Sequence, residues 1–156
     1  MAEKAVVQAH EVTYELHTLG WKAFQDLCVA ITREVLGQTV QAFLPSKDGG
    51  RDGAFYGNWD QHDKTGIKGS FSIQCKFTSK KSNKLSLAQL KDELKKVKRL
   101  ASRGLATNYI LMTNYNVSGT TDEKIKEVFL SIPGLKNFLL FGSDWITSQI
   151  RESSRL

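Results

Sequence analysis

The chain has 156 residues, of which 40% are hydrophobic and 24% are charged, a composition typical of an ordinary soluble domain. It contains no apolar run near the roughly 20 residues that a membrane-spanning helix needs, and its polar first residues lack the apolar centre of a signal peptide. We therefore expect a cytoplasmic protein. Cys28 and Cys75 lie in apolar segments without the spacing of a zinc site, so we expect two buried free thiols.

The net charge of +6 is unevenly distributed. Between Lys76 and Arg103 there are ten basic residues and two acidic ones, so the rest of the chain is slightly negative. A local positive charge suits a polyanion, with nucleic acid as the first candidate and an anionic membrane as the second. A plainer interpretation, in which the lysines only solubilise one helix face, stays open at this point.

The first half of the chain predicts one helix followed by three strands. Residues 1–18 have weak periodicity and are expected to form an arm or a short helix ahead of one domain at 19–156. A helical spacing of apolar residues then predicts a helix that Gly37 ends; its stripe is Trp21, Phe24, Leu27, Cys28, Ile31 and Val35. Strands are predicted at 39–45, 52–57 and 70–77, separated by the glycine turn 46–53 and the polar loop 58–69.

The second half alternates helices and strands. A helix at 85–103, closed by Gly104, has the apolar stripe Leu87, Leu90, Leu94, Val97 and Ala101. A strand at 106–113, apolar enough to be buried on both sides, precedes a helix at 120–132 and a strand at 137–142. The last helix is expected to be N-capped by Ser143 and to bury Trp145, Ile146 and Ile150. Three successive strands favour a meander, and the later alternation favours parallel pairing, so we expect an α/β fold with a mixed sheet.

The third predicted strand, SFSIQCKF, separates its side chains onto two faces. Phe71, Ile73, Cys75 and Phe77 form an apolar face, whereas Gln74 and Lys76 point to the other side. Asp52 opens the preceding strand, so pairing of the two strands would bring Asp52 beside Gln74 and Lys76. A polar strand face exposed to water is the alternative that any such QxK pattern must be weighed against.

These three residues and one carbonyl suit metal-assisted phosphodiester hydrolysis. Carboxylate, amide and main-chain carbonyl oxygens are hard ligands of the kind Mg²⁺ prefers. A bound Mg²⁺ lowers the pKa of water and polarises a phosphoryl oxygen. A nearby lysine can orient or deprotonate the attacking water, or stabilise the transition state.

The joint pattern resembles the PD-(D/E)xK restriction-endonuclease-like superfamily, and more narrowly its Mrr-like branch. The quoted segments are LGWKAFQDLC (19–28), KDGGRDG (47–53), IQCKF (73–77) and YILMTN (109–114). The resemblance covers about residues 19 to 145, and it implies an αβββαβ core with a mixed sheet flanked by helices. It also implies a metal-dependent DNA endonuclease, in which QxK replaces (D/E)xK.

By this resemblance, Asp52, Gln74 and Lys76 match the catalytic positions, and Asp52, Gln74 and the carbonyl of Cys75 match the metal ligands. Mg²⁺ is the expected cofactor, and Mn²⁺ is a substitute. This chain departs from the pattern in two places. Gln74 is neutral, and the glutamate that the first helix of the family often offers is absent, with Gln25 and Asp26 as the nearest candidates. Asp48 could supply a second carboxylate or could stabilise the turn.

The resemblance implies DNA, with double-stranded DNA favoured, as the partner and substrate, and no membrane. Five basic residues flank the expected site and are candidates for phosphate contacts: Lys47, Arg51, Lys80, Lys81 and Lys84. Nuclease modules of this kind often serve in restriction or anti-phage defence, fused to sensor or NTPase domains. A homo-oligomer is a further expectation, because cutting both strands needs two active sites.

Other interpretations stay open. The chain could be a nucleic-acid-binding module that has kept the fold and lost catalysis, as the neutral Gln74 suggests. It could instead be a protein-interaction domain whose basic helix at 85–103 docks an acidic partner. In the polar loop, Asp60, His62 and Asp63 could form a metal cluster, although a solvated loop is favoured, and Trp59 could stack on a base or pack on the sheet.

Overall fold

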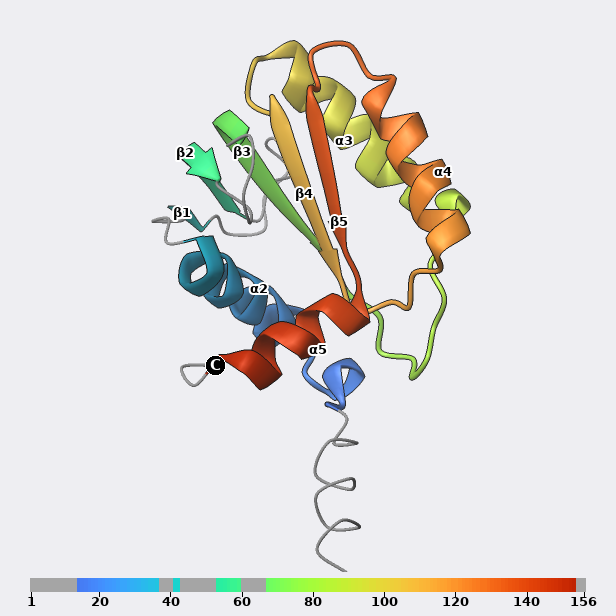
Figure 1. Ribbon diagram of the computed structural model, residues 1–156. Helices are drawn as coiled ribbons and strands as arrows, with labels where there is room; N and C mark the ends of the chain where they lie inside the picture. The colour runs from blue at the N-terminus through green and yellow to red at the C-terminus, as the bar shows by residue number, and fades with distance from the viewer. Residues whose placement is uncertain (1–13, 37–40, 43–52, 60–66, 154–156) are drawn as a thin grey trace, which may run out of the picture.

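The computed structural model describes residues 14–36, 41–42, 53–59 and 67–153; for residues 36, 41–42, 53–59, 67 and 68 it describes the backbone alone. Within these residues the chain forms a five-stranded sheet with helices on both faces (Figure 1). The expected N-terminal arm and the glycine turn lie largely outside the described residues. The part of the arm that is described includes the 3₁₀ turn η1 (Leu16–Thr18), whose Leu16 is buried in the core.

The sheet has the order β1-β2-β3-β4-β5, the order of the strands along the chain. Its strands are β1 (Gln41–Ala42), β2 (Gly53–Trp59), β3 (Ile67–Lys76), β4 (Asn108–Thr113) and β5 (Asn137–Phe141). The pairs β1–β2 and β2–β3 are antiparallel, whereas β3–β4 and β4–β5 are parallel. The predicted mixed α/β sheet, with a meander first and parallel pairs later, is therefore confirmed.

Two pairs of helices cover the sheet. On one side lie α2 (Trp21–Leu36) and α5 (Ser143–Glu152); on the other lie α3 (Lys91–Ser102) and α4 (Gly119–Leu130), as Figure 1 shows. The central strand β4 is buried along its whole length, as predicted. Its alternate side chains enter different cores: Tyr109 and Leu111 face α3 and α4, whereas Ile110 and Met112 face α2 and α5.

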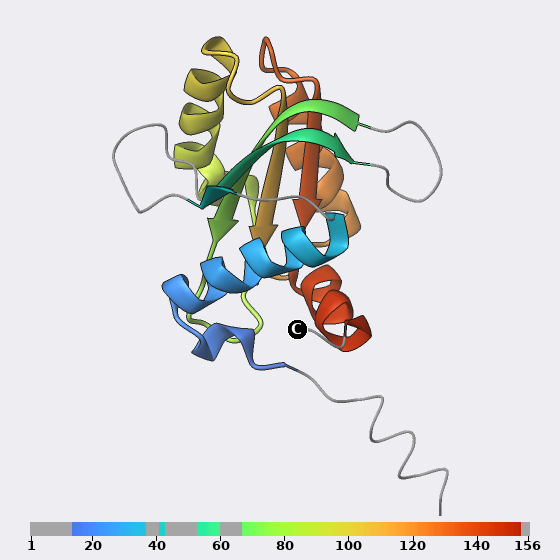
Figure 2. The ribbon, with the colours of Figure 1, turned by 90° about the vertical axis from the view of Figure 1, so that its left-hand side faces the viewer.

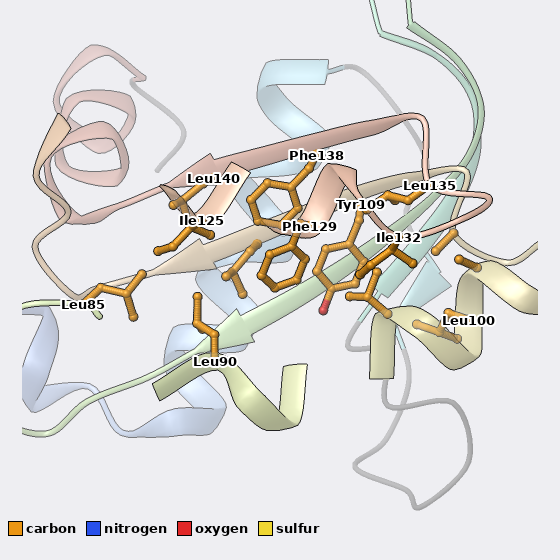
Figure 3. Close-up of a cluster of buried hydrophobic side chains, with 14 of the residues drawn as sticks. Leu85, Leu90, Leu100, Tyr109, Ile125, Phe129, Ile132, Leu135, Phe138 and Leu140 are labelled. Carbon is orange, nitrogen blue, oxygen red and sulfur yellow. The ribbon is translucent and has the colours of Figure 1, made fainter. Parts of the chain in front are cut away.

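The core beneath α3 and α4 is built around three stacked aromatic rings (Figure 3). The centroids of Phe129 and Phe138 are 4.3 Å apart, and that of Tyr109 lies 6.0 Å from Phe138. Among the β3 residues whose side chains are described, 69–76, none belongs to this cluster, because those that face α3 are polar. Among them, Ser72 Oγ donates to the Leu105 carbonyl at 2.7 Å. The structure therefore places a polar strip between β3 and α3 beside an apolar core.

Several predicted boundaries were wrong in instructive ways. The polar loop predicted at 58–69 is partly strand, because the β2–β3 pairing continues from Gly53–Ile73 to Trp59–Ile67. Trp59 is thus the last residue of β2; its side chain, like Asp60, His62 and Asp63, lies outside the described side chains. Main-chain pairing between antiparallel strands does not require apolar side chains on both faces, so alternation alone understated the strand length.

Helix limits also differ from the prediction. The helix expected at 85–103 starts as the 3₁₀ turn η2 (Leu87–Leu90), where Ser86 N–H donates to Gln89 Oε1, and becomes α-helical at Lys91. Its end is as predicted: Gly104 has a φ of +70°, and the Leu105 N–H donates to the Leu100 carbonyl at 2.9 Å. The strand expected from 106 starts at Asn108, and the following helix is Gly119–Leu130, capped by Ser118.

The N-cap of α5 is Gly142, not Ser143 as predicted. The Ser143 N–H donates to the Tyr115 carbonyl at 3.0 Å, which draws Ser143 into the first turn. A Cβ on Gly142 would come within 2.9 Å of Val117 Cγ2, so a side chain at this position would force a neighbouring group to shift. The predicted inward packing of the helix is confirmed: Ile146 is buried, and Trp145 and Ile150 pack against the same core.

The apolar stripe of α2 was predicted too long. Phe24, Cys28 and Ile31 are fully buried, but Trp21 is 55% exposed and Val35 is 41% exposed. Both exposed residues lie in the terminal turns, beyond the part of the helix that packs on the sheet. The two cysteines are free thiols, but only Cys28 is fully buried; Cys75 is half-buried.

Candidate active site

The carboxyl end of β3 holds the described part of the expected site. In Figure 2 the arrowheads of β3, β4 and β5 all point toward α2. In open α/β sheets, ligands bind beyond this end of the parallel strands. Gln74, Cys75 and Lys76 are the last three residues of β3. Opposite them, the described part of β2 begins at Gly53, which pairs with Ile73.

The predicted division of β3 into two faces is confirmed. Phe71, Ile73, Cys75 and Phe77 pack into the core beneath α2 and α5. Lys76 points to the opposite face, because its Nζ lies 3.1 Å from Glu93 Oε1 on α3. Alternation places Gln74 on the same face as Lys76, and Gln74 is buried. The QxK residues therefore face α3 and are not a solvated strand surface.

The terminal amide of Gln74 lies close to one of the predicted metal ligands. Its Nε2 is 3.4 Å from the main-chain carbonyl oxygen of Cys75. A half-turn of a glutamine amide exchanges its nitrogen for its oxygen with little change in shape. As the side chain is placed, the nitrogen donates to the Cys75 carbonyl; a half-turn, at the cost of that hydrogen bond, would bring the amide oxygen beside the carbonyl as a second metal ligand.

Glu93 is the member of the site that the sequence analysis did not single out. It is 6% exposed, and in the described part of the chain it is the only charged residue that is buried. Its Oε1 accepts from Lys76 Nζ, while no hydrogen-bond donor among the described residues reaches its Oε2. A buried oxygen of a carboxylate without a donor is energetically costly, and a cation would offset that cost. A sequence signal existed, because Glu93 lies three residues after Leu90 and four before Val97, both buried.

Of the other four candidate ligands, two lie outside the described residues and two are on α2. Asp52 and Asp48 lie outside the described residues. Asp26 is on the exposed side of α2, where its carboxylate binds Lys22 Nζ at 2.7 Å. Gln25 is buried on α2, which covers the face of the sheet opposite α3.

The basic residues predicted to contact phosphates are described in part. Lys47 and Arg51 lie outside the described residues. Lys80, Lys81 and Lys84 are exposed in the loop 79–84 that follows β3. This loop, which we call the basic loop, has a left-handed residue, Ser82, with a φ of +56°.

Hydrogen bonds hold the basic loop against the end of β4. Asn114 Oδ1 accepts from the Thr78 N–H and its Nδ2 donates to the Thr78 carbonyl, both at 2.8 Å. Within the loop, Asn83 Nδ2 donates to Thr78 Oγ1 at 2.9 Å, and the Asn116 N–H donates to the Asn83 carbonyl at 2.8 Å. Both Thr78 and Asn114 are buried. These hydrogen bonds therefore hold the main chain that carries the loop lysines next to the end of β3.

A hollow of about 400 Å³ opens beside the basic loop. Its basic lining residues are His17, Lys80, Lys81 and Arg151, and Glu15 and Asp144 are its acidic ones. Lys81 Nζ is 3.7 Å from a carboxylate oxygen of Glu15, an exposed pair that is worth little in water. The hollow continues from the loop toward α5, with both basic and acidic residues in its lining.

The oxygen atoms near the end of β3 are of the type that bind hard divalent cations such as Mg²⁺. The Gln74 amide adjoins the Cys75 carbonyl at the end of β3, and Glu93, which contacts Lys76, has its Oε2 buried without a donor among the described residues. Over the same residues no three His, Cys, Asp or Glu side chains form a cluster, so a site there would draw on amide and carbonyl oxygens as well. The described helices include none long and apolar enough to cross a membrane.

The fold and this strand end define a nuclease of the restriction-endonuclease-like class. A family model described as restriction endonuclease, of the Mrr catalytic type, matches residues 16–132. The chain therefore belongs to the Mrr-type restriction endonuclease family, whose substrate is DNA and whose members generally use divalent metals. Searches of the curated proteins and of the solved structures find no match.

Proposed function

We propose that this domain is a Mg²⁺-dependent endonuclease that hydrolyses phosphodiester bonds of double-stranded DNA. The observation that carries the proposal is the position of Gln74 and Lys76 on one face at the carboxyl end of β3, with a buried carboxylate against the lysine. Asp52 is bonded to Gly53, the residue that pairs with Ile73 next to Gln74, which supports its assignment as the acidic ligand. Mn²⁺ is expected to substitute for Mg²⁺.

Each residue has a distinct task in the proposed reaction. Asp52, Gln74 and the Cys75 carbonyl would hold the metal, which when bound supplies an activated water and neutralises charge on the phosphate. Lys76 Nζ would orient the attacking water and donate hydrogen bonds to the charged phosphoryl oxygens. The water oxygen bonds to phosphorus while the bond to one sugar oxygen breaks, which leaves a phosphate end and a hydroxyl end. Lys80, Lys81 and Lys84, with Lys47 and Arg51, would contact backbone phosphates on either side.

The proposal is tested by nicking of supercoiled plasmid in Mg²⁺ or Mn²⁺. We expect the wild type to convert the plasmid to open circles, and Asp52→Ala to lose at least a hundredfold in rate while DNA binding in a gel shift is retained. Asp26→Ala, on the exposed side of α2, is the matched control and should nick like the wild type. Equal nicking by wild type and Asp52→Ala would remove Asp52 from the site.

The neutral Gln74 favours one alternative, a DNA-binding module without catalysis. A wild type that shifts DNA in a salt-dependent way but never nicks with either metal, even when concentrated enough to oligomerise, would support this alternative. A protein that shows no DNA binding at low salt would instead favour a protein partner for the basic surface. We further propose that the domain is a module of a larger defence protein with fused sensor or NTPase domains.

A further inference from the structure

The helix α3 carries a buried acid that the proposed mechanism leaves without a task. Glu93 lies on the face that also buries Val97, Leu100 and Ala101. The neighbouring acid, Asp92, is exposed, as is usual for a charged residue in the first turn of a helix. Burial of the second acid therefore needs an explanation.

An ion pair that only fastens α3 to the sheet explains the burial poorly. The apolar side chains of Leu90, Val97 and Leu100 already hold this helix against the core. A buried ion pair is seldom more stabilising than apolar residues of the same volume, because desolvation offsets the attraction between the charges. The pair also satisfies only half of the carboxylate: Oε1 contacts Lys76 Nζ at 3.1 Å, and no donor of the described residues reaches Oε2.

The proposed metal ligands carry little negative charge with which to bind a divalent cation. Asp52 is the one carboxylate among the proposed ligands, because Gln74 and the Cys75 carbonyl are neutral. The lysine beside them adds a positive charge that opposes metal binding. A second carboxylate would compensate that charge, and Glu93 is the acid in contact with that lysine.

We propose that Glu93 is the second carboxylate of the catalytic centre: its Oε1 positions Lys76, and its Oε2 is a ligand of the divalent metal. The assignment rests on the proposed function, since it deepens the description of the same site. In the (D/E)xK pattern the acid lies on the strand, two residues before the lysine. Here Gln74 occupies that position, and Glu93 on the neighbouring helix supplies the carboxylate. Gln74 then serves as a neutral donor without leaving the metal short of charge.

Metal binding without DNA tests the proposal directly. We would titrate Mg²⁺ and Mn²⁺ into the wild type, Glu93→Gln and Asp92→Asn by isothermal calorimetry. Both variants remove one negative charge from adjacent positions, but Asp92 is exposed and lies outside the proposed site. We expect Glu93→Gln to weaken the metal Kd at least tenfold and Asp92→Asn to change it less than twofold. Equal loss in both variants, or none in Glu93→Gln, would overturn the proposal.

A rescue experiment separates a missing ligand from damaged packing. The double variant Glu93→Gln/Gln74→Glu returns the carboxylate to the strand and keeps the wild-type net charge. We expect it to recover most of the metal affinity, whereas Glu93→Gln/Asp92→Glu, which restores no charge to the site, should not. If circular dichroism shows Glu93→Gln unfolded, Glu93→Asp decides instead. It keeps the charge but withdraws the carboxylate, so a loss of several-fold supports the proposal and an unchanged Kd overturns it.

Plasmid nicking distinguishes this inference from the proposed function. A wild type that nicks, together with a Glu93→Gln variant that binds metal normally, overturns the role of Glu93 and leaves the nuclease proposal standing. A wild type that binds metal through Glu93 but never nicks supports the inference and removes the nuclease. A wild type that binds neither metal overturns both.

Discussion

At the scale of single residues, the contact between Lys76 and Glu93 makes any test of the catalytic lysine also a test of stability. The Glu93 side chain is 8% exposed and that of Lys76 is 21% exposed. Loss of the lysine leaves a buried carboxylate with no cation, which is costly. Reduced activity of a lysine variant therefore has two causes that must be separated.

A double-mutant cycle separates these causes. We expect Lys76→Met to lower the free energy of unfolding by about 2 to 3 kcal/mol, below the usual cost for a fully buried pair because Lys76 is partly exposed. Lys76→Met/Glu93→Gln should recover more than half of that loss, since the stranded charge is gone. Urea denaturation of the two single variants and the double variant measures the coupling. Additive losses would contradict the pair as a coupled unit.

At the scale of elements, the order of strands and helices and the two faces of β3 could be predicted from the sequence because both follow from local periodicity. Glu93 was missed although its spacing from Leu90 and Val97 places it on the buried face of the helix. A charged residue in a helix is normally assigned to solvent, and its partner Lys76 is 17 residues away on another element. The limits of β2 and β3 were missed for a related reason, since main-chain pairing with a neighbour extended them into polar sequence.

The side chain of Asn114 makes two of the hydrogen bonds at the junction of β3, the basic loop and β4. It bonds both the N–H and the carbonyl of Thr78, as a neighbouring strand would. We expect Asn114→Ala to cost about 2 to 3 kcal/mol of unfolding free energy, because two buried main-chain groups lose their partners. Amide hydrogen exchange should also become faster at Thr78 than in the wild type.

Asn116→Ala is the matched control for this prediction. Asn116 is exposed, and its hydrogen bonds to Asn83 and Leu85 are made by its main chain. Its removal should change stability by less than about 0.5 kcal/mol in the same urea titration. Equal losses at the two positions would mean that the asparagine side chain is not what fixes the basic loop.

At the scale of the whole molecule, the positive charge lies on two surfaces that DNA could use. One is the basic loop at the carboxyl end of the sheet, which carries Lys80, Lys81 and Lys84. Two of these lysines, Lys80 and Lys81, also line the hollow beside α5. The other is the exposed side of α3, which carries Lys95, Lys98 and Arg99. The basic loop follows directly on the end of β3, so a strand bound for cleavage should use it.

Salt dependence of DNA binding decides between these surfaces, because each phosphate contact adds about 0.9 to the slope of log affinity against log salt. We expect replacement of the three loop lysines by Gln to reduce that slope by about 2 to 3 units in fluorescence anisotropy with a short duplex. The matched variant with Gln at 95, 98 and 99 loses the same charge, so its slope should change by less than one unit if those residues are only solvated. The reverse order would place the duplex on the exposed side of α3 and would favour a binding module over a nuclease. Similar reductions in both variants would indicate a duplex that spans the loop and the helix.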